Sequence, residues 1–270
     1  MTDLTLSASE ISTWMRCPRE WQYHYLRGLS VPEESAPLAA GKVLHIALAA
    51  RRRGAPLGKQ LIALNDSYSV ATVTSPKLTF VYPLAYLQAV LSAYNTRYDP
   101  DPFLTVRAEE HILLLESSMG PVEGILDALG TGKFLDTKTT AKFITDTFYA
   151  SFSPNVQFQH YWCLLDEQGT CPSECWVDIV RLDPKTRTVK PEHFIRYGPV
   201  TYSEGQLAEH RATVLAVRGE IAQAQERGYF RQNPGACLRG SQLCDYHPLC
   251  SIDPSIRDAR ILDLYCTRGG

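Results

Sequence analysis

The segment from residue 122 to residue 139 constrains the fold more than any other part of the chain. Two runs of strand-forming residues lie on either side of a glycine-rich turn centred on Thr131-Gly132. This pattern predicts a β-hairpin with a two-residue turn. Side chains pair symmetrically about such a turn, so the register places Asp127 directly opposite Asp136.

The two aspartates predict a site for a divalent cation. Opposed residues of a hairpin have Cβ atoms about 4.5–5.5 Å apart, so two carboxylates there repel each other. A bound cation compensates this repulsion, and Mg²⁺ prefers one or two carboxylates together with water and substrate phosphate. Lys138 lies two residues after Asp136 and therefore on the same face of the strand. A lysine there can help to deprotonate an attacking water or neutralise charge on phosphate.

The set Asp127, Asp136 and Lys138 therefore favours metal-assisted hydrolysis of a phosphodiester. The alternative is a solvated edge hairpin with a single Asp–Lys pair, because a short motif alone often arises by chance. Motifs elsewhere in the chain bear on this choice.

Periodicity and turn residues predict a mixed α/β (α+β) chain. Residues 54–79 and the tail from Asn233 show little periodicity, and no repeat or clear linker is present. We therefore expect one domain over residues 1–270. Its expected parts are a helical region at about 1–100, a catalytic sheet at 103–200, and a helix with a Cys-rich tail at 203–270. Helices are expected at 7–16, from Pro18, at 38–53, 82–98, 155–167 and 203–228, and strands at 107–116, 122–129, 133–139, 176–182 and 193–197.

Composition excludes several classes of protein. With 44% hydrophobic and 21% charged residues the chain is of ordinary globular type. The formal net charge of −2 excludes a histone-like partner bound by bulk charge, although local patches can still attract phosphate. No run of about 18 apolar residues occurs. The N-terminus lacks the basic start and apolar stretch of a signal peptide, so a cytoplasmic chain without a membrane span is expected.

In the cytoplasm, the eight cysteines indicate whether the chain binds a metal. Cytosolic thiols rarely form disulfides, so the choice is between buried apolar thiols and metal ligands. Cys17 stands alone near the N-terminus, and Cys237, Cys244 and Cys250 fall close together near the C-terminus.

Several motifs, taken in order, resemble those of RecB/AddB-type nuclease domains of the PD-(D/E)XK superfamily. The resemblance runs from residue 7 to residue 250, nearly the whole chain. The last cysteines resemble the iron–sulfur version of these domains, found in AddB and in the CRISPR-associated adaptation nucleases. The matching segments are Ser7-x-Ser9-x4-Trp14-x2-Cys17-Pro18-x2-Trp21-x-Tyr23-x-Tyr25-Leu26, Gly41-Lys-Val-Leu-His45-Ile-Ala-Leu48, Gly124-Ile-Leu-Asp127, Asp136-Thr-Lys138 and Gln157-Phe-Gln-His-Tyr161.

The resemblance implies a restriction-endonuclease-like core, a mixed central sheet flanked by helices. It also implies Mg²⁺ or Mn²⁺ as cofactor. The implied roles are metal ligation by His45, Asp127, Asp136 and the carbonyl of Thr137, catalysis by Lys138, and orientation of DNA or water by Gln157 and Tyr161.

The resemblance further assigns Cys17, Cys237, Cys244 and Cys250 to a [4Fe–4S] cluster that joins the N-terminal and C-terminal segments. The six-residue gap after Cys237 departs from the family, which usually has two residues there. Four thiolates can also hold zinc. Cys163 reads as a packed helix residue, and a zinc set built on Cys171, Cys175 and Cys266 has unconvincing spacing.

A few residues admit two interpretations. His45 is either a metal ligand or a core histidine between two leucines, and Tyr161 can also pack in its helix. Arg51-Arg52-Arg53 is either a solvated face or a phosphate contact. Glu109 and Glu110 precede the first strand of the hairpin region, where related nucleases often place an acidic residue.

Together these features predict a Mg²⁺- or Mn²⁺-dependent deoxyribonuclease, an exonuclease on single-stranded DNA or DNA ends. Such a nuclease would act in recombination, repair or CRISPR adaptation, with a helicase, recombinase or CRISPR integrase as a candidate partner. The alternative is a non-catalytic DNA-binding or adaptor protein with a structural zinc or iron–sulfur site. Gly54–Lys59 is one residue too short for a phosphate-binding loop and lacks the following Ser or Thr, so no motor is expected in this chain.

Overall fold

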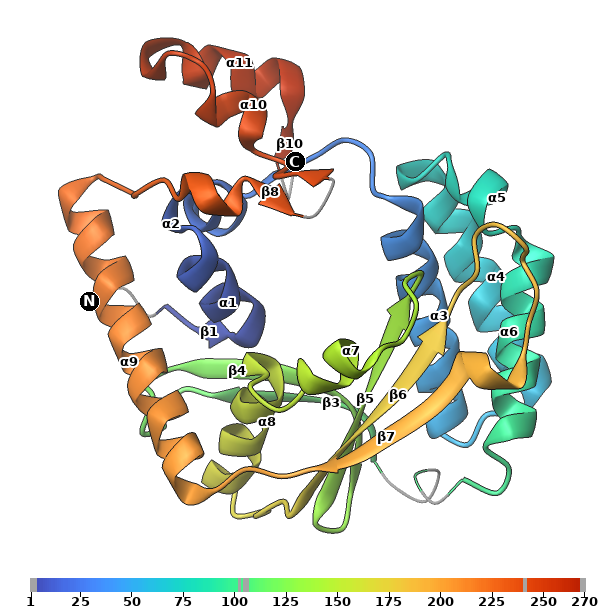
Figure 1. Ribbon diagram of the computed structural model, residues 1–270. Coiled ribbons are helices and arrows are strands. Elements are labelled where there is room, and N and C mark those ends of the chain that lie inside the picture. Colours follow the sequence, from blue (N-terminus) through green and yellow to red (C-terminus); the bar gives the residue numbers. More distant parts are fainter. Residues whose placement is uncertain (1–3, 102, 104–106, 240–241, 268–270) are drawn as a thin grey trace. The chain divides into compact units, whose positions relative to one another are not determined.

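The computed structural model describes residues 4–101, 103, 107–239 and 242–267, without the side chains of 107–110 and 239. The chain forms two compact units (Figure 1). The first comprises Met1–Pro32, Leu113–Glu123 and Gly205–Gly270, and the second Glu33–Ile112 and Gly124–Glu204. The expectation of one domain over the whole chain stays a prediction.

In the sheet of the second unit the strands β4, β5, β6 and β7 are neighbours in that order. Pairing of β5 with β6 is parallel, whereas β5 pairs with β4, and β6 with β7, antiparallel. The strand β3 (Arg107–Leu114) also pairs with β4. The bounds are Val122–Gly130 for β4, Lys133–Thr140 for β5, Glu174–Arg181 for β6 and Phe194–Val200 for β7.

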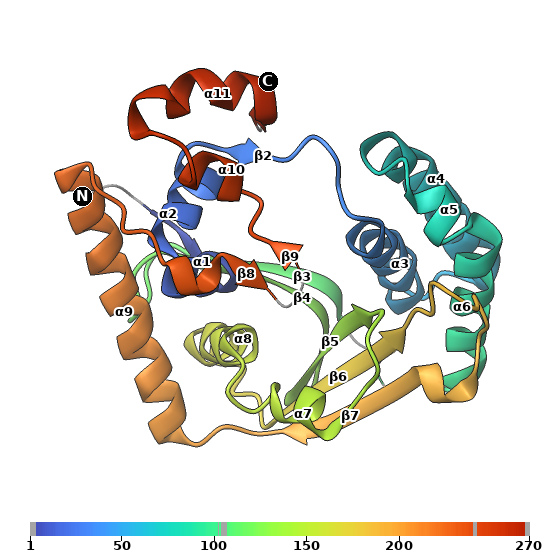
Figure 2. The same ribbon diagram turned by 45° about the horizontal axis from the view of Figure 1, so that its top comes forward.

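Helices cover both faces of β5 (Figure 2). The short α7 (Asp146–Ala150) and α8 (Val156–Glu167) form the crossover to β6. On the face of α8, Phe134 meets Tyr161 edge to face. On the face of α3 (Ala36–Arg52), Thr137 and Thr139 contact the helix. The alternation of side chains along β5 thus divides its contacts between two helices.

Three further helices pack beside α3 (Figure 1). They are α4 (Leu57–Thr74), α5 (Leu78–Val81) and α6 (Leu84–Arg97). Leucine, tyrosine and alanine side chains of these helices form the main core of the unit with residues of β6 and β7. Together with α8 they give the central mixed sheet flanked by helices that was predicted.

The first unit begins with β1 (Leu6–Ser7), which pairs in parallel with the first two residues of β4. Ser7 and Glu10 form the predicted capping box of α1 (Ala8–Arg16), and Pro18 opens α2 (Pro18–Trp21). The π-helix η1 (Gln22–Leu26) and β2 (Leu29–Ser30) follow.

The long helix α9 (Glu204–Arg227) leads to a tail of short elements in the same unit. Arg218 of α9 donates to the carbonyls of Leu4, Met119 and Pro121, which ties three segments together. The tail comprises η3 (Pro234–Ala236), β8 (Leu238–Arg239), β9 (Gln242–Leu243), α10 (His247–Cys250), η4 (Pro254–Ile256), α11 (Arg257–Leu264) and β10 (Cys266–Thr267), which pairs with β2.

Residues 54–79 show little periodicity and no helix was predicted there, yet α4 fills most of this range. Its outward face carries the exposed Ile62, Val70 and Val73, so apolar residues surround the helix and hide its period. Helix α11 was also missed, since it spans only Arg257–Leu264. Across the residues described, no helix is both long and apolar enough to span a bilayer.

Candidate active site

The hairpin turn is the predicted one. Gly130 pairs with Lys133, which leaves Thr131 and Gly132 as the two turn residues. Gly132 adopts a left-handed backbone with φ of 67°, which glycine tolerates without a steric cost. The β4–β5 register is therefore the register expected from the sequence.

Backbone pairing of β4 with β5 extends to Ala128 and Leu135, one step before the two aspartates. Beyond this point the Thr137 N–H donates to Asp127 Oδ2 at 2.6 Å. The Asp127 carboxylate thus accepts a hydrogen bond from a backbone N–H of β5, and this bond fixes Asp127 beside Asp136.

Four predicted residues form one hydrogen-bonded chain. Lys138 Nζ lies 2.7 Å from Asp136 Oδ2 and donates to Gln157 Oε1 at 2.6 Å. Gln157 Nε2 donates to Asp136 Oδ1 at 3.2 Å and to the Tyr161 hydroxyl at 2.8 Å. The shared faces predicted for Asp136 with Lys138, and for Gln157 with Tyr161, are confirmed.

The close approach of α8 to β4 depends on Gly124. A Cβ at this position would lie 2.7 Å from Leu164 Cδ1 and 2.8 Å from Tyr161 Cε1. A side chain there would force the Leu164 and Tyr161 side chains to shift. The glycine of the first acidic motif therefore sets the position of the tyrosine of the helical motif.

A second glycine brings α3 to the site from the other face of the sheet. A Cβ at Gly41 would lie 2.6 Å from Thr139 Oγ1. One turn further along the helix, His45 Nδ1 lies 3.4 Å from Asp127 Oδ1. The His45 side chain is 35% exposed and faces a carboxylate, so the alternative of a core histidine was wrong.

Arg52 also belongs to this cluster. Its side chain is only 4% exposed, donates to Thr137 Oγ1 and lies 3.7 Å from Asp127 Oδ2. Arg51 is equally buried and pairs with Asp101 at 2.7 Å. Both interpretations of the arginine run were therefore wrong for these two residues, because buried carboxylates on the inner side of α3 compensate their charges. Arg53 is exposed.

The pKa values of the two aspartates are shifted in opposite directions. Burial alone would raise the pKa of Asp127, but the His45 hydrogen bond and the Arg52 charge hold this pKa well below its usual value. Burial raises the pKa of Asp136, and the charge of Asp127 adds to this effect against the opposing charge of Lys138. Asp136 Oδ2 is buried and, among the described residues, accepts no well-directed hydrogen bond.

The donor set suits Mg²⁺ or Mn²⁺ in chemistry. Carboxylate oxygens and a neutral imidazole are suitable ligands, and the incompletely bonded Asp136 Oδ2 marks a position where a cation would stabilise the pair. Lys138 lies 2.7 Å from Asp136 and Arg52 lies 3.7 Å from Asp127, so both place a positive charge beside the carboxylates. Within the part of the chain described, no group of three or more His, Cys, Asp or Glu side chains is arranged to hold a metal ion.

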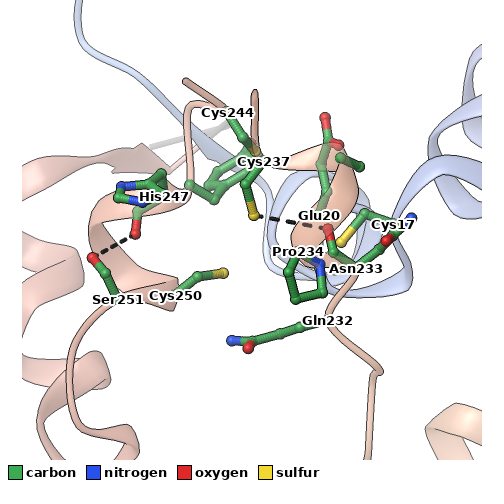
Figure 3. Close-up of a pocket in the computed structure, with 12 residues that line it drawn as sticks. Cys17, Glu20, Gln232, Asn233, Pro234, Cys237, Cys244, His247, Cys250 and Ser251 are labelled. Carbon is green, nitrogen blue, oxygen red and sulfur yellow. Dashed lines mark hydrogen bonds between the residues drawn. The ribbon is translucent and has the colours of Figure 1, made fainter. Parts of the chain in front are cut away.

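The four cysteines assigned to the cluster line one pocket of the first unit (Figure 3). The cavity measures about 210 Å³, and the thiols of Cys17, Cys237 and Cys250 point into it. Burial raises the pKa of the Cys250 thiol to about 11, and the charges of Cys17 and Cys244 add to the rise. Cys237, which departs from the family spacing, lies with the other three.

The remaining cysteines lie outside this pocket. Cys163 is buried in α8, as predicted, and Cys175 is buried on β6. Cys171 and Cys266 are exposed. The side chains of Glu109 and Glu110 lie outside the described part of the chain.

Sequence reasoning missed a buried charge network next to the site. Asp178 of β6 binds Arg196 through Nε at 2.7 Å and accepts a hydrogen bond from Tyr94. Arg196 also binds Asp101 at 2.8 Å, and Asp101 binds Arg51. A lone aspartate within the apolar run of β6 was the available signal, since a buried carboxylate requires a partner.

The sequence pattern of the PD-(D/E)XK nuclease superfamily matches residues 5–251. The chain therefore belongs to this superfamily, and its class is that of the nucleases. No curated protein matches it in sequence.

Its fold is similar to that of the crystal structure named "Putative exonuclease" from Eubacterium rectale, with a TM-score of 0.52 and 12% sequence identity. The match covers 93% of this chain and 94% of the other. At this identity the likeness concerns the fold alone.

Proposed function

We propose that the protein is a Mg²⁺- or Mn²⁺-dependent deoxyribonuclease that acts as an exonuclease on single-stranded DNA or DNA ends. The observation that carries this proposal is the linked set of Asp127, Asp136, Lys138 and Gln157 in a nuclease-superfamily chain. The exonuclease assignment also draws support from the name of the protein with the similar fold.

The residues that would hold the ion are His45, Asp127, Asp136 and the carbonyl of Thr137. The ion, when bound, acts as a Lewis acid at the phosphate and lowers the pKa of water. Lys138 lies against Asp136 in the same set, 2.7 Å from Oδ2, so its ammonium group lies beside the position that the ion would take.

The protein's own groups then perform distinct tasks. Lys138 carries the proton at Nζ and neutralises charge that develops on the phosphate. Gln157 holds Lys138 through Oε1 at 2.6 Å and is itself held by Tyr161, so the lysine has one orientation. Arg52 keeps Asp127 ionised and fixes the side chain of Thr137. Arg52 therefore acts as a positioning residue.

A [4Fe–4S] cluster held by Cys17, Cys237, Cys244 and Cys250 is the second part of the proposal. Four thiols around one cavity of about 210 Å³ support it. Four thiolates of this kind can hold either a [4Fe–4S] cluster or a zinc ion, and the resemblance to the iron–sulfur nucleases is the reason to propose the cluster. This assignment makes the chain an iron–sulfur nuclease of RecB/AddB type.

The test is a cleavage assay with labelled single-stranded and duplex DNA in Mg²⁺, Mn²⁺ or EDTA. We expect cleavage that requires the divalent ion and that Lys138→Ala reduces by about 10²-fold or more, with DNA binding retained. The control is Lys133→Ala on the same strand, whose ammonium lies 4.7 Å from the Phe103 ring centre. Absence of metal-dependent cleavage by the native protein would instead favour the non-catalytic DNA-binding alternative.

A further inference from the structure

The carboxyl ends of the parallel strands β5 and β6 carry an aromatic residue outside the site already described. Thr140 pairs with Arg181 at these ends, and the loop from β5 to α7 follows at once. Phe143 of this loop is 76% exposed, five residues after Lys138. Ligands of open α/β sheets bind outside the carboxyl ends of parallel strands.

Phe143 is supported from one side by a fixed cation. The Arg181 guanidinium carbon lies 4.2 Å from the centre of the Phe143 ring. Arg181 itself is 15% exposed and is held by His193 Nε2 at 3.2 Å and by Asp183 at 3.8 Å. Burial and the charge of Arg181 lower the pKa of His193, so the neutral imidazole can accept this hydrogen bond. The ring therefore rests on a preorganised support.

The chemistry of this surface matches an unpaired strand of nucleic acid. Proteins that bind single strands combine aromatic rings, on which bases stack, with cations that follow the phosphates. Here the exposed Lys142 adjoins Phe143, and Arg181 lies beneath the ring. The Arg181 cation attracts one face of the Phe143 ring and so helps to hold the ring in place, while the other face stays open to a base.

We propose that Phe143, backed by Arg181 and flanked by Lys142, is a stacking platform for an unpaired base of the DNA strand that reacts beside Lys138. The proposal rests on the proposed nuclease function and specifies its substrate as single-stranded at this point. Five residues of chain reach at most about 18 Å, so one short strand can contact both places. Bases inside a duplex already stack on both faces and offer none to a protein ring.

The experiment measures by anisotropy the binding of a short fluorescein-labelled single strand, and its displacement by an unlabelled covalently closed circular duplex that has neither an unpaired loop nor an open end. Ca²⁺ replaces Mn²⁺ so that binding is read without cleavage. We expect Phe143→Ala to weaken single-strand binding roughly ten-fold and Phe143→Trp to restore it, because one base–aromatic stack contributes this order of affinity. Duplex binding should stay unchanged.

The matched control is Phe80→Ala, since Phe80 is 77% exposed on α5. Its single-strand affinity should equal that of the native protein. An unchanged affinity in Phe143→Ala, or an equal loss for the duplex, overturns the platform. Either outcome leaves the nuclease proposal standing if the native protein still cleaves DNA with Mn²⁺ and Lys138→Ala does not. Loss of cleavage in the native protein refutes the nuclease function independently of the platform.

Discussion

Gly124 lies so close to Tyr161 that a Cβ on the glycine would stand 2.8 Å from Tyr161 Cε1. This approach links the strand that carries Asp127 to the helix that carries Gln157. Since Gln157 holds both Asp136 and Lys138, the spacing of β4 and α8 sets the geometry of the whole site.

Replacement of Gly124 by alanine should therefore impair cleavage indirectly, through the position of α8 and not through a contact with the substrate. Overpacking at a buried position costs about 1–3 kcal/mol of stability, and the ring of Tyr161 has to shift. We expect a lower melting temperature and a cleavage rate reduced about ten-fold or more, since misplaced groups lose rate steeply. Gly58→Ala, where a Cβ meets no atom within 4 Å, should change neither. A Gly124→Ala enzyme of native rate would show that α8 does not position the lysine.

The neighbouring arginines 51 and 52 offer a matched pair, because both are 4% exposed and only Arg52 contacts the candidate site. Arg52→Gln should reduce metal affinity and cleavage about 10- to 100-fold, as loss of a group that supports a ligand usually does. The cause is a rise in the pKa of Asp127 once the arginine charge is gone.

Arg51→Gln should mainly lower stability, because buried Asp101 then keeps only Arg196 as its ionic partner. Cleavage rates are compared per folded molecule, with folding followed by circular dichroism. Equal losses of cleavage in the two variants would contradict the assignment of Arg52 as a positioning residue.

Stability should fall in acid through Asp101. Burial raises the pKa of this carboxyl, but hydrogen bonds from Arg196 and from the Phe103 N–H outweigh burial and lower it. A carboxyl whose pKa is lowered in the folded state stabilises fully above its unfolded pKa, near 3.9, and the contribution disappears as pH falls through the folded value.

Asp101→Asn should accordingly have a lower melting temperature than the native protein at neutral pH. Its melting temperature should also depend less on pH below ~4. Parallel acid profiles of the two proteins would show that other carboxyls cause the loss.

Cys17→Ser tests the iron–sulfur assignment. Removal of one of four ligands should release the cluster, whose binding free energy is part of folding, and expose the tail to proteases. Iron, sulfide and visible absorbance of anaerobically purified protein give the result without any assay of activity. Cys163→Ser, a buried thiol of α8, should keep its iron. A full complement of iron in Cys17→Ser would mean that a different cysteine supplies the fourth ligand.

Local signals sufficed to predict much of the site. The Thr131-Gly132 turn fixed the register, and the intervals in Asp136-x-Lys138 and Gln157-x3-Tyr161 placed side chains on shared faces. Such periodicities are properties of single elements, so they can be read without knowledge of tertiary packing.

Tertiary partners could not be predicted in this way. In the sequence Arg51 and Arg52 form only a charge run. Both arginines can be buried because Asp101 and Thr137, which lie far away in the sequence, supply their polar partners. Helix α4 escaped notice because Val70 and Val73 expose apolar side chains that normally mark a core face. For the two arginines, contacts distant in sequence override the local pattern.

The central claim is that Asp127 and Asp136 hold the ion required for DNA hydrolysis. The most direct measurement is the single-turnover rate of DNA cleavage with saturating Mn²⁺ by Asp136→Asn, beside the native protein and Asp66→Asn, whose residue is exposed on α4. We predict a loss of about 10³-fold or more in Asp136→Asn alone, with a melting temperature no lower than native, since repulsion from Asp127 is removed. Cleavage by Asp136→Asn at the native rate would contradict the account.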